Sequence, residues 1–164
     1  MALTQILGLW GEGIERVKEA LEIYGRFNDI RGQAQALRQL SRLLYEDGQF
    51  DAAEGATSKA IDLFSDEDNQ FGVCNCHNTL GNIYRLRGEI EKAIDHYQTA
   101  LGIASSFGWA GPQFWNNYSL AQLFFSEKRF DDAHAYIQHA KSHTASDTHN
   151  LGRAMELQAE FWYK

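Results

Sequence analysis

The stretch Leu80–Leu101, LGNIYRLRGEIEKAIDHYQTAL, decides the fold because it carries two helical patterns around one glycine. Apolar residues recur at the three- and four-residue spacing of a helix before Gly88, and a second stripe of the same kind follows it. A glycine between two such stripes is typical of a helix end. Ala93 and Ala100 lie two turns apart in the second stripe and let another backbone come close. The stretch therefore predicts two helices built for helix-on-helix contact.

The same pattern returns along the whole chain at an interval of 40 residues. Ala20, Ala60, Ala100 and Ala140 mark this interval. The same shift aligns six further columns: Gly32 with Gly72 and Gly152; Leu40 with Leu80 and Leu120; Leu44 with Tyr84 and Phe124; Gly48 with Gly88; Phe50 with Ile90 and Phe130; and Ala53 with Ala93 and Ala133. A fixed period of this length indicates a repeat array in which neighbouring units share one core.

Each unit is expected to be helix, tight turn, helix, so the fold class is all-α, with antiparallel helix hairpins. We predict one array over 1–164, with repeats at 28–67, 68–107 and 108–147 and partial repeats at 1–27 and 148–164. The paired helices are expected near 31–47 and 50–64, 70–87 and 90–105, and 112–127 and 131–144. Residues 1–7 are expected to end a first helix, with a turn at Gly8 and a partner at 10–27, and 150–164 to be a first helix alone. Asp51, Glu91 and Asp131 begin second helices, where an acid complements the helix dipole.

Composition excludes several classes of partner. The 164-residue chain has a formal charge of -7, which opposes a nucleic-acid footprint of clustered lysine and arginine. With a single proline and no low-complexity tract, it contains no obvious linker. Its N-terminus lacks the basic start and apolar run of a signal peptide, and no window approaches the roughly 18 apolar residues of a membrane span. We therefore expect a cytoplasmic protein that binds neither membrane nor nucleic acid.

The repeat unit resembles the tetratricopeptide repeat over nearly the whole chain. The matching residues are Leu80, Gly81, Tyr84, Gly88, Ala93, Tyr97 and Ala100. Other copies depart from the pattern: Ser41 and Ala121 replace the glycine after leucine, Lys128 replaces the turn glycine, and Leu37, His77 and Asn117 stand at the usual tryptophan position. The period of 40 is similar to that of the long-repeat branch found in kinesin light chains, spindle-orientation adaptors and the tails of fungal NLR-type receptors. The resemblance implies a right-handed superhelical solenoid that binds proteins without catalysis, with the first helices lining its concave face.

The outward positions of the first helices form a stripe at 3, 4, 3 spacing. The predicted positions are Gln35, Arg38, Arg42 and Tyr45; Asn75, Asn78, Asn82 and Arg85; and Trp115, Tyr118, Gln122 and Phe125. Asparagine amides would hold a peptide backbone, arginines would bind an acidic or C-terminal carboxylate group, and aromatics would receive apolar side chains. The resemblance assigns asparagine and basic residues the same use. The two-carboxylate clamp of chaperone-binding members is incomplete here, because other residues occupy its lysine positions. The alternative to the peptide-binding hypothesis is that the arginines are solvated or paired and that the aromatics are covered by a neighbouring helix.

Self-association is a second functional hypothesis, because both ends of the array are incomplete. The last helix carries Leu157, Phe161, Trp162 and Tyr163, and its tail would pair with another copy to form a homodimer. A fragment of a longer array is the other explanation of the unfinished ends.

Other chemistry has weaker support. His139 and His143 are four apart, but no third metal ligand accompanies them at fixed spacing. Cys74 and Cys76 diverge on a helix and are expected to be reduced and buried. The glycines of residues 8–13 lack the lysine of a phosphate loop. No cofactor, metal or enzymatic activity is expected.

Overall fold

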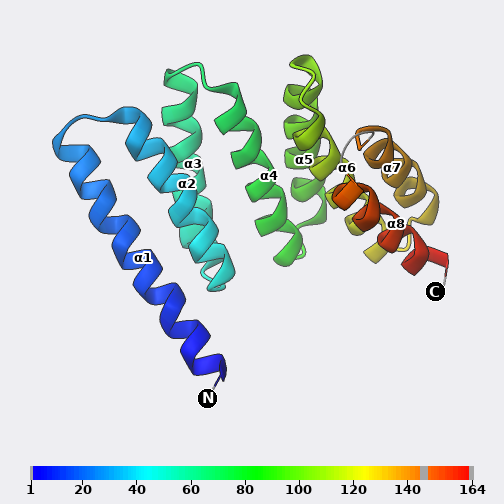
Figure 1. Cartoon of the computed structure of the whole chain (residues 1–164), viewed down its shortest axis with the longest axis horizontal. Helices are drawn as coiled ribbons and strands as arrows, with labels where there is room; N and C mark the ends of the chain where they lie inside the picture. Colours follow the sequence, from blue (N-terminus) through cyan, green and yellow to red (C-terminus); the bar gives the residue numbers. More distant parts are fainter. Residues whose placement is uncertain (1, 145–147, 163–164) are drawn as a thin grey trace. The chain divides into compact units, whose positions relative to one another are not determined.

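The computed structural model describes residues 2–144 and 148–162, and of residues 2–9, 148 and 160–162 it describes the backbone alone. The described residues form eight α-helices and no strand (Figure 1). Their bounds are α1 Ala2–Arg26, α2 Ile30–Glu46, α3 Phe50–Asp66, α4 Gln70–Leu86, α5 Ile90–Ser106, α6 Ala110–Ser126, α7 Phe130–Ser142 and α8 Thr148–Trp162. The predicted all-α hairpin architecture is confirmed, and the predicted paired helices lie within about two residues of these bounds.

One helix differs from its prediction. The turn expected at Gly8 is wrong, because α1 continues as one helix from Ala2 to Arg26. A glycine inside a helix costs about 1 kcal/mol relative to alanine but does not by itself end it. The turn glycines of this chain instead adopt a positive φ, as at Gly48 and Gly88.

All helices from α1 to α7 are joined by three-residue turns of one kind. The middle residue of each turn has a positive φ, between 51° and 78°; these residues are Asn28, Gly48, Asp68, Gly88, Gly108 and Lys128. The next residue donates its N–H to a carbonyl five residues earlier, as Gln49 does to Leu44 at 2.8 Å. This hydrogen bond is that of the Schellman motif, which closes a helix end. Five consecutive helices, α2 to α6, have 17 residues, so the 40-residue period contains two equal helix-and-turn steps.

Lys128→Gly is expected to raise the free energy of unfolding by about 1 kcal/mol. A side chain in the left-handed region brings its Cβ close to the carbonyl oxygen, and Lys128 is held there with φ of 60°. Thermal unfolding followed by circular dichroism would measure the gain. Gly88→Ala is the matched control, since it creates the same strain at φ of 75° and should lower the melting temperature. A destabilised Lys128→Gly protein would contradict the strain argument.

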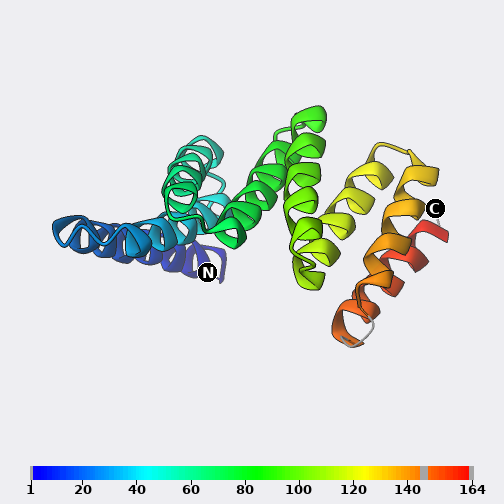
Figure 2. The ribbon, with the colours of Figure 1, turned by 90° about the horizontal axis from the view of Figure 1, so that it is seen from above.

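The chain divides into two compact units, Met1–Ile83 and Tyr84–Lys164, with the boundary inside α4. In the first unit α1 packs on α2 and α2 packs on α3. In the second unit α5 packs on α6, and α6, α7 and α8 pack on one another, as Figure 2 shows for α6 and α7. Each predicted repeat, 28–67, 68–107 and 108–147, encloses one pair of helices.

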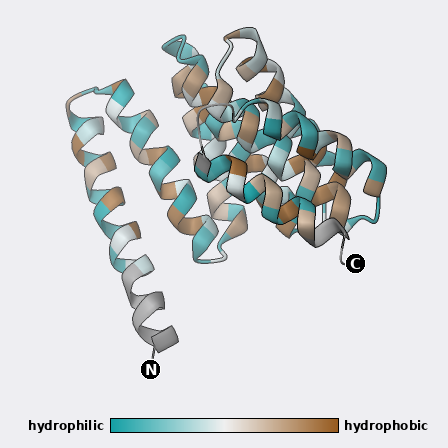
Figure 3. Cartoon of the chain, turned by 45° about the vertical axis from the view of Figure 1, so that its right-hand side comes forward, coloured by the Kyte–Doolittle hydropathy of each residue, from teal (hydrophilic) through white to brown (hydrophobic). Residues whose placement is uncertain are grey.

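Alanines are fully buried on the packed helix faces of both units. Ala53, Ala60, Ala93 and Ala100 have no exposed surface, and the aligned residues of α7 are equally buried. Large side chains fill the space between these contacts, including Phe64 in the first unit and Tyr97 in the second. Figure 3 shows hydrophobic and hydrophilic residues mixed along each helix, as expected for helices with one buried face.

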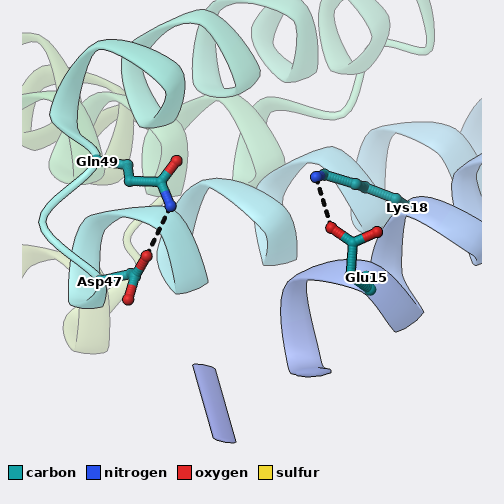
Figure 4. A network of polar contacts seen from close by, with 4 residues as sticks. All are labelled: Glu15, Lys18, Asp47 and Gln49. Atoms are coloured by element: carbon teal, nitrogen blue, oxygen red, sulfur yellow. Dashed lines mark hydrogen bonds and ion pairs between the residues drawn. The ribbon is translucent and has the colours of Figure 1, made fainter. Parts of the chain in front are cut away.

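Charged and polar side chains pair locally on the outer surface. Lys18 binds Glu15 at 2.7 Å on α1, and Gln49 donates to Asp47 at 2.6 Å in the turn after α2 (Figure 4). The acids predicted at the start of second helices lie in the first turns of α3, α5 and α7. Exposed pairs of this kind contribute at most about 1 kcal/mol each. The fold therefore depends on its buried helix faces.

Candidate binding site

A hollow of about 640 Å³ lies between α2 and α4 in the first unit. From α2 it is lined by Arg31, Gln35 and Arg38; the other lining residues are Phe64, Asn69, Phe71, Gly72, Asn75, Asn78 and Thr79. The predicted site residues Arg38, Asn75 and Asn78 therefore lie together on one surface. Its volume is in the range of ligand-binding clefts.

The hollow is positively charged although the chain is acidic. Its two charged lining residues are Arg31 and Arg38, and none of the described residues that line it is acidic. Within the described part of the chain, neither arginine forms an ion pair with a carboxylate. Arg31 is exposed and Arg38 is half-buried. Both guanidinium groups are therefore available to an anionic ligand.

A row of amides forms the opposite wall. Asn75 and Asn78 are half-buried along α4, and Asn78 Oδ1 accepts a hydrogen bond at 3.3 Å from the amide of Asn82, which lies outside the hollow. Asn69 precedes them and accepts the backbone N–H of Gly72 at 2.9 Å, which caps the start of α4. Amide groups both donate and accept hydrogen bonds, as a peptide backbone requires.

Close contact between Gly72 and Phe64 determines the shape of the hollow. A Cβ built on Gly72 would lie 2.5 Å from Cγ of Phe64, whose ring is only 2% exposed. Glycine is the residue that permits this approach of α4 to α3. Phe71, beside it, is 49% exposed and presents an apolar surface to the hollow.

Other predicted site residues lie outside this hollow. Arg42 is exposed and Tyr45 is half-buried further along α2, where Tyr45 meets Phe50 edge to face at 6.2 Å. Asn82 lies one turn beyond Asn78 on α4. Arg85 belongs to the second unit, and its Nε is buried without a hydrogen-bond partner among the described residues.

The predicted aromatic positions form a surface in the second unit. Trp115 is 38% exposed, and its ring centroid lies 6.0 Å from that of Tyr118 on the same helix. Arg153 of α8 places its guanidinium carbon 5.3 Å from the Trp115 ring centroid, so one face is covered by a cation. Phe125 contacts Phe130 edge to face at 5.6 Å, while Gln122 is half-buried. The rings are partly covered, as the alternative reading expected, yet Trp115 still reaches the surface.

Known proteins share both the repeat and the fold. Residues 74–107 match the family model described as tetratricopeptide repeat. The chain therefore contains a tetratricopeptide repeat at residues 74–107 and shares the fold of TPR-like repeat proteins. Its fold is similar to that of BtubC from P. vanneervenii, with a TM-score of 0.75 and 17% identity over 99% of this chain and 66% of that one. It is also similar to a putative kinesin light chain with nearly identical TPR-like repeats from Podosopora anserina, with a TM-score of 0.68 and 13% identity over 93% and 81%.

A shorter stretch matches curated relatives. Fifty residues are 48% identical to Lipopolysaccharide assembly protein B of Escherichia coli strain K12, which is 29% of this chain and 12% of that protein. The chain thus spans a small part of this relative's length. At this coverage the similarity concerns the repeat unit. Repeats of this family generally serve as non-catalytic scaffolds for protein–protein interaction.

Part of the hollow was not predicted from the sequence. Arg31 and Phe71 line it but lie one turn before the predicted stripes, which began at Gln35 and Asn75. Extending each stripe by four residues toward its N-terminus would have found both. Asn69 could not be found in this way, because it lies in the turn and enters the hollow through its capping geometry.

Both cysteines are free and buried, as predicted. Burial raises the pKa of the Cys76 thiol to about 12, and although Arg38 opposes this rise, it is too weak to cancel it. A buried neutral thiol is a poor nucleophile because the thiolate is the reactive form. The cysteines therefore belong to the core next to the hollow.

The raised pKa of Cys76 predicts how the free energy of unfolding depends on pH. Its folded pKa of about 12 lies above the ordinary value of 9.0, so folding favours the protonated thiol. This contribution is complete below about pH 9 and is lost as the pH rises toward 12. The urea midpoint should fall less over that range in Cys76→Ala than in the parent chain. Equal falls in both proteins would contradict the assignment.

Three of the four residues predicted for self-association belong to α8. Leu157 is 6% exposed and packs in a core cluster with Phe114, Ile137 and Ala154, so it offers no free surface in this structure. Phe161 and Trp162 belong to the helical backbone of α8, and Tyr163 lies outside the described residues. The structure therefore does not test self-association, which remains a prediction.

Among the described residues, no group of three or more histidine, cysteine or acidic side chains is placed to hold a metal ion, including around His139 and His143. None of the described helices combines the length and the apolar character needed to cross a membrane.

Proposed function

We propose that this protein holds an extended segment of another protein in the hollow between α2 and α4. The observation that carries the proposal is the lining itself: two arginines without acidic partners on α2 face a row of amides on α4. Amides of Asn75 and Asn78 hold the peptide backbone by paired hydrogen bonds. Arg38 binds a carboxylate on the segment in a charge-assisted hydrogen bond.

The bound segment continues beyond the hollow. Arg42 and Tyr45 on α2 and Asn82 on α4 extend the surface by one to two turns. In the second unit, the buried Nε of Arg85 would gain a hydrogen bond if a partner brought an acceptor to it, which offsets the cost of leaving that group unpaired. In the second unit, Trp115, Tyr118, Gln122 and Phe125 form a separate aromatic surface that binds apolar side chains of a partner.

A peptide-display selection on the intact chain tests the proposal. Peptides enriched on the parent protein are expected to lose about tenfold or more in affinity for Arg38→Gln and for Asn78→Ala, measured by fluorescence polarisation. Both positions are half-buried at the surface, so the melting temperature should change little.

Lys59→Gln is the matched control, because it removes one positive charge from an exposed position on α3, outside the hollow's lining. It should bind the selected peptides like the parent. Equal affinity of the parent, Arg38→Gln and Asn78→Ala for the selected peptides would overturn the assignment of the hollow.

A further inference from the structure

One side of α1 is more exposed than the equivalent side of the other second helices. Ala20 is half-buried, whereas the three alanines aligned with it at the 40-residue period have no exposed surface. Those alanines are Ala60, Ala100 and Ala140. Ile23 is 52% exposed, while the aligned Leu63 and Ile103 are half-buried. Helix α2 packs on the other side of α1, at the left of Figure 1, so the described residues leave this face of α1 uncovered.

The uncovered residues form one stripe along α1. They follow one another at 4, 3, 4 spacing, which places their side chains on one face. They are Arg16, Ala20, Ile23 and Phe27. Phe27 extends the stripe just past the helix end, because its N–H donates to the carbonyl of Ile23 at 3.2 Å, and its ring is 79% exposed. A stripe of this spacing is what one helix presents to another in a coiled-coil pair, and the small Ala20 at its centre permits close approach of a second backbone.

The two ends of this stripe differ in charge. Its N-terminal end borders an acidic depression of about 410 Å³, which is lined by Gly11, Glu12, Glu15, Arg16 and Glu19. At the C-terminal end, the side chain of Arg26 is 76% exposed, and its contact with Glu22 is long, at 3.8 Å. Exposed pairs of this kind are weak. One face of α1 therefore combines an acidic end with an accessible guanidinium group.

A second copy of α1 complements this face when the two helices run antiparallel. Glu12 and Arg26 are each seven residues from Glu19, so a twofold axis at the level of Glu19 places Arg26 of one copy opposite Glu12 of the other. The symmetry forms this pair twice. The same axis brings Ile23 of one copy to Arg16 of the other, whose hydrocarbon stem covers apolar surface. The two Glu19 side chains lie near the axis and repel each other, which weakens the pair.

The size of the face sets the strength of the contact. From Gly13 to Phe27 it is about 21 Å long at 1.5 Å per residue and about 10 Å wide, the diameter of a helix. Two such faces bury roughly 800 Å² in total, less than the roughly 1,200 Å² of a stable interface. The dimer is therefore expected to be weak, with a Kd of about 10 μM to 1 mM.

We propose that α1 is a self-association surface through which two copies of this chain pair antiparallel. The stripe forms the contact, and Arg26 of each copy binds Glu12 of the other. The α8 tail is not part of this surface, and no described residue of α1 is among those that line the hollow between α2 and α4. The inference is therefore independent of the proposed function.

Sedimentation velocity of the full chain between about 10 μM and 1 mM tests the pairing. Glu12→Arg and Arg26→Glu each turn two attractive pairs into two repulsive ones, so each variant alone should dimerise about tenfold more weakly than the parent. An equimolar mixture of the two variants forms a heterodimer in which both pairs are attractive again. The mixture should therefore dimerise like the parent, and added salt should reduce the difference between each variant and the parent.

Further variants separate the apolar contact from a general effect of charge. Ile23→Lys should abolish dimerisation because it places a cation in the stripe, and the 52% exposure of Ile23 lets the monomer tolerate the change. Lys18→Glu is the matched control, since it reverses a charge at an exposed position of α1 outside the stripe, and it should dimerise like the parent. Glu19→Gln should dimerise about two- to threefold more tightly. Circular dichroism of each variant checks that the helices are retained.

Three results would overturn the inference. They are a parent chain that stays monomeric at about 1 mM, a mixture that associates no more tightly than its two components, and a Lys18→Glu dimer as weak as that of Arg26→Glu. A monomeric parent would leave the uncovered face of α1 to a helix of another protein. The peptide selection on the hollow is decided separately from all three.

Discussion

Leu157→Ala is expected to lower the free energy of unfolding by about 2–5 kcal/mol. Leu157 is 6% exposed, and its cluster joins α6, α7 and α8 through Phe114, Ile137 and Ala154. Truncation leaves a cavity among side chains that already pack closely, so the loss includes both transfer and cavity terms. Urea unfolding followed by circular dichroism would show a lower midpoint.

Met155→Ala is the matched control on the same helix. Met155 is 55% exposed, so its truncation should change stability by no more than about 0.5 kcal/mol. Light scattering of both variants distinguishes a role of α8 in the core from a role in self-association. If Leu157→Ala keeps its stability but breaks up a dimer formed by the parent, Leu157 acts in self-association and the core assignment is wrong.

The cluster also changes how self-association is best tested. Removing residues 151–164 would take Ala154 and Leu157 away from the core and expose Phe114 and Ile137. A truncated chain would then lose stability whether or not it dimerises. Point substitution at exposed Met155, with the oligomeric state measured across protein concentrations, avoids this ambiguity.

Gly72→Ala is expected to destabilise the first unit by about 3 kcal/mol, the upper end of the usual cost of overpacking. The new Cβ would lie 2.5 Å from Cγ and 2.6 Å from Cδ1 of Phe64, closer than carbon atoms can approach. Phe64 is 2% exposed, so its ring has no free space into which to turn. Helix α4 must therefore move away from α3, which also alters the hollow.

Adding Phe64→Leu to the Gly72→Ala protein tests whether this steric clash is the cause of the lost stability. The smaller side chain makes room for the Cβ, so the two substitutions together should cost less than the sum of their separate costs. Gly102→Ala is the control, because nothing lies within 4 Å of its Cβ position on α5. It should stabilise the chain by roughly 0.5–1 kcal/mol. Additive costs at Gly72 and Phe64 would contradict the steric explanation.

The hairpin fold could be predicted because its causes are local and repeated. The 40-residue alignment placed Ala53, Ala93 and Ala133 in equivalent columns, and all three are fully buried. Helix periodicity gave the elements, and glycine marked two of the turns. Residue type alone does not identify every turn, since the Schellman turn at Lys128 forms without glycine.

Only part of the candidate site could be predicted from helical spacing. Helical spacing showed that Arg38, Asn75 and Asn78 share outward faces, but spacing cannot say which outward residues meet across two helices. Gly8 illustrates the same limit within one helix, where the expected turn was replaced by a continuous α1. The polar residues Asn69 and Arg31 joined the site through the approach of the turn before α4 to α2.

The sequence by itself determined the helix hairpins, their period and the buried alanine columns, because each depends on residues close together in the chain. Tertiary structure alone decided that Leu157 lies in a core and that Arg31, Phe71 and Asn69 share a hollow with Arg38. The physical reason is that a helix period specifies the direction of a side chain around its own axis. What that side chain meets depends on how closely the neighbouring helix approaches, and at Gly72 a single missing Cβ sets that distance.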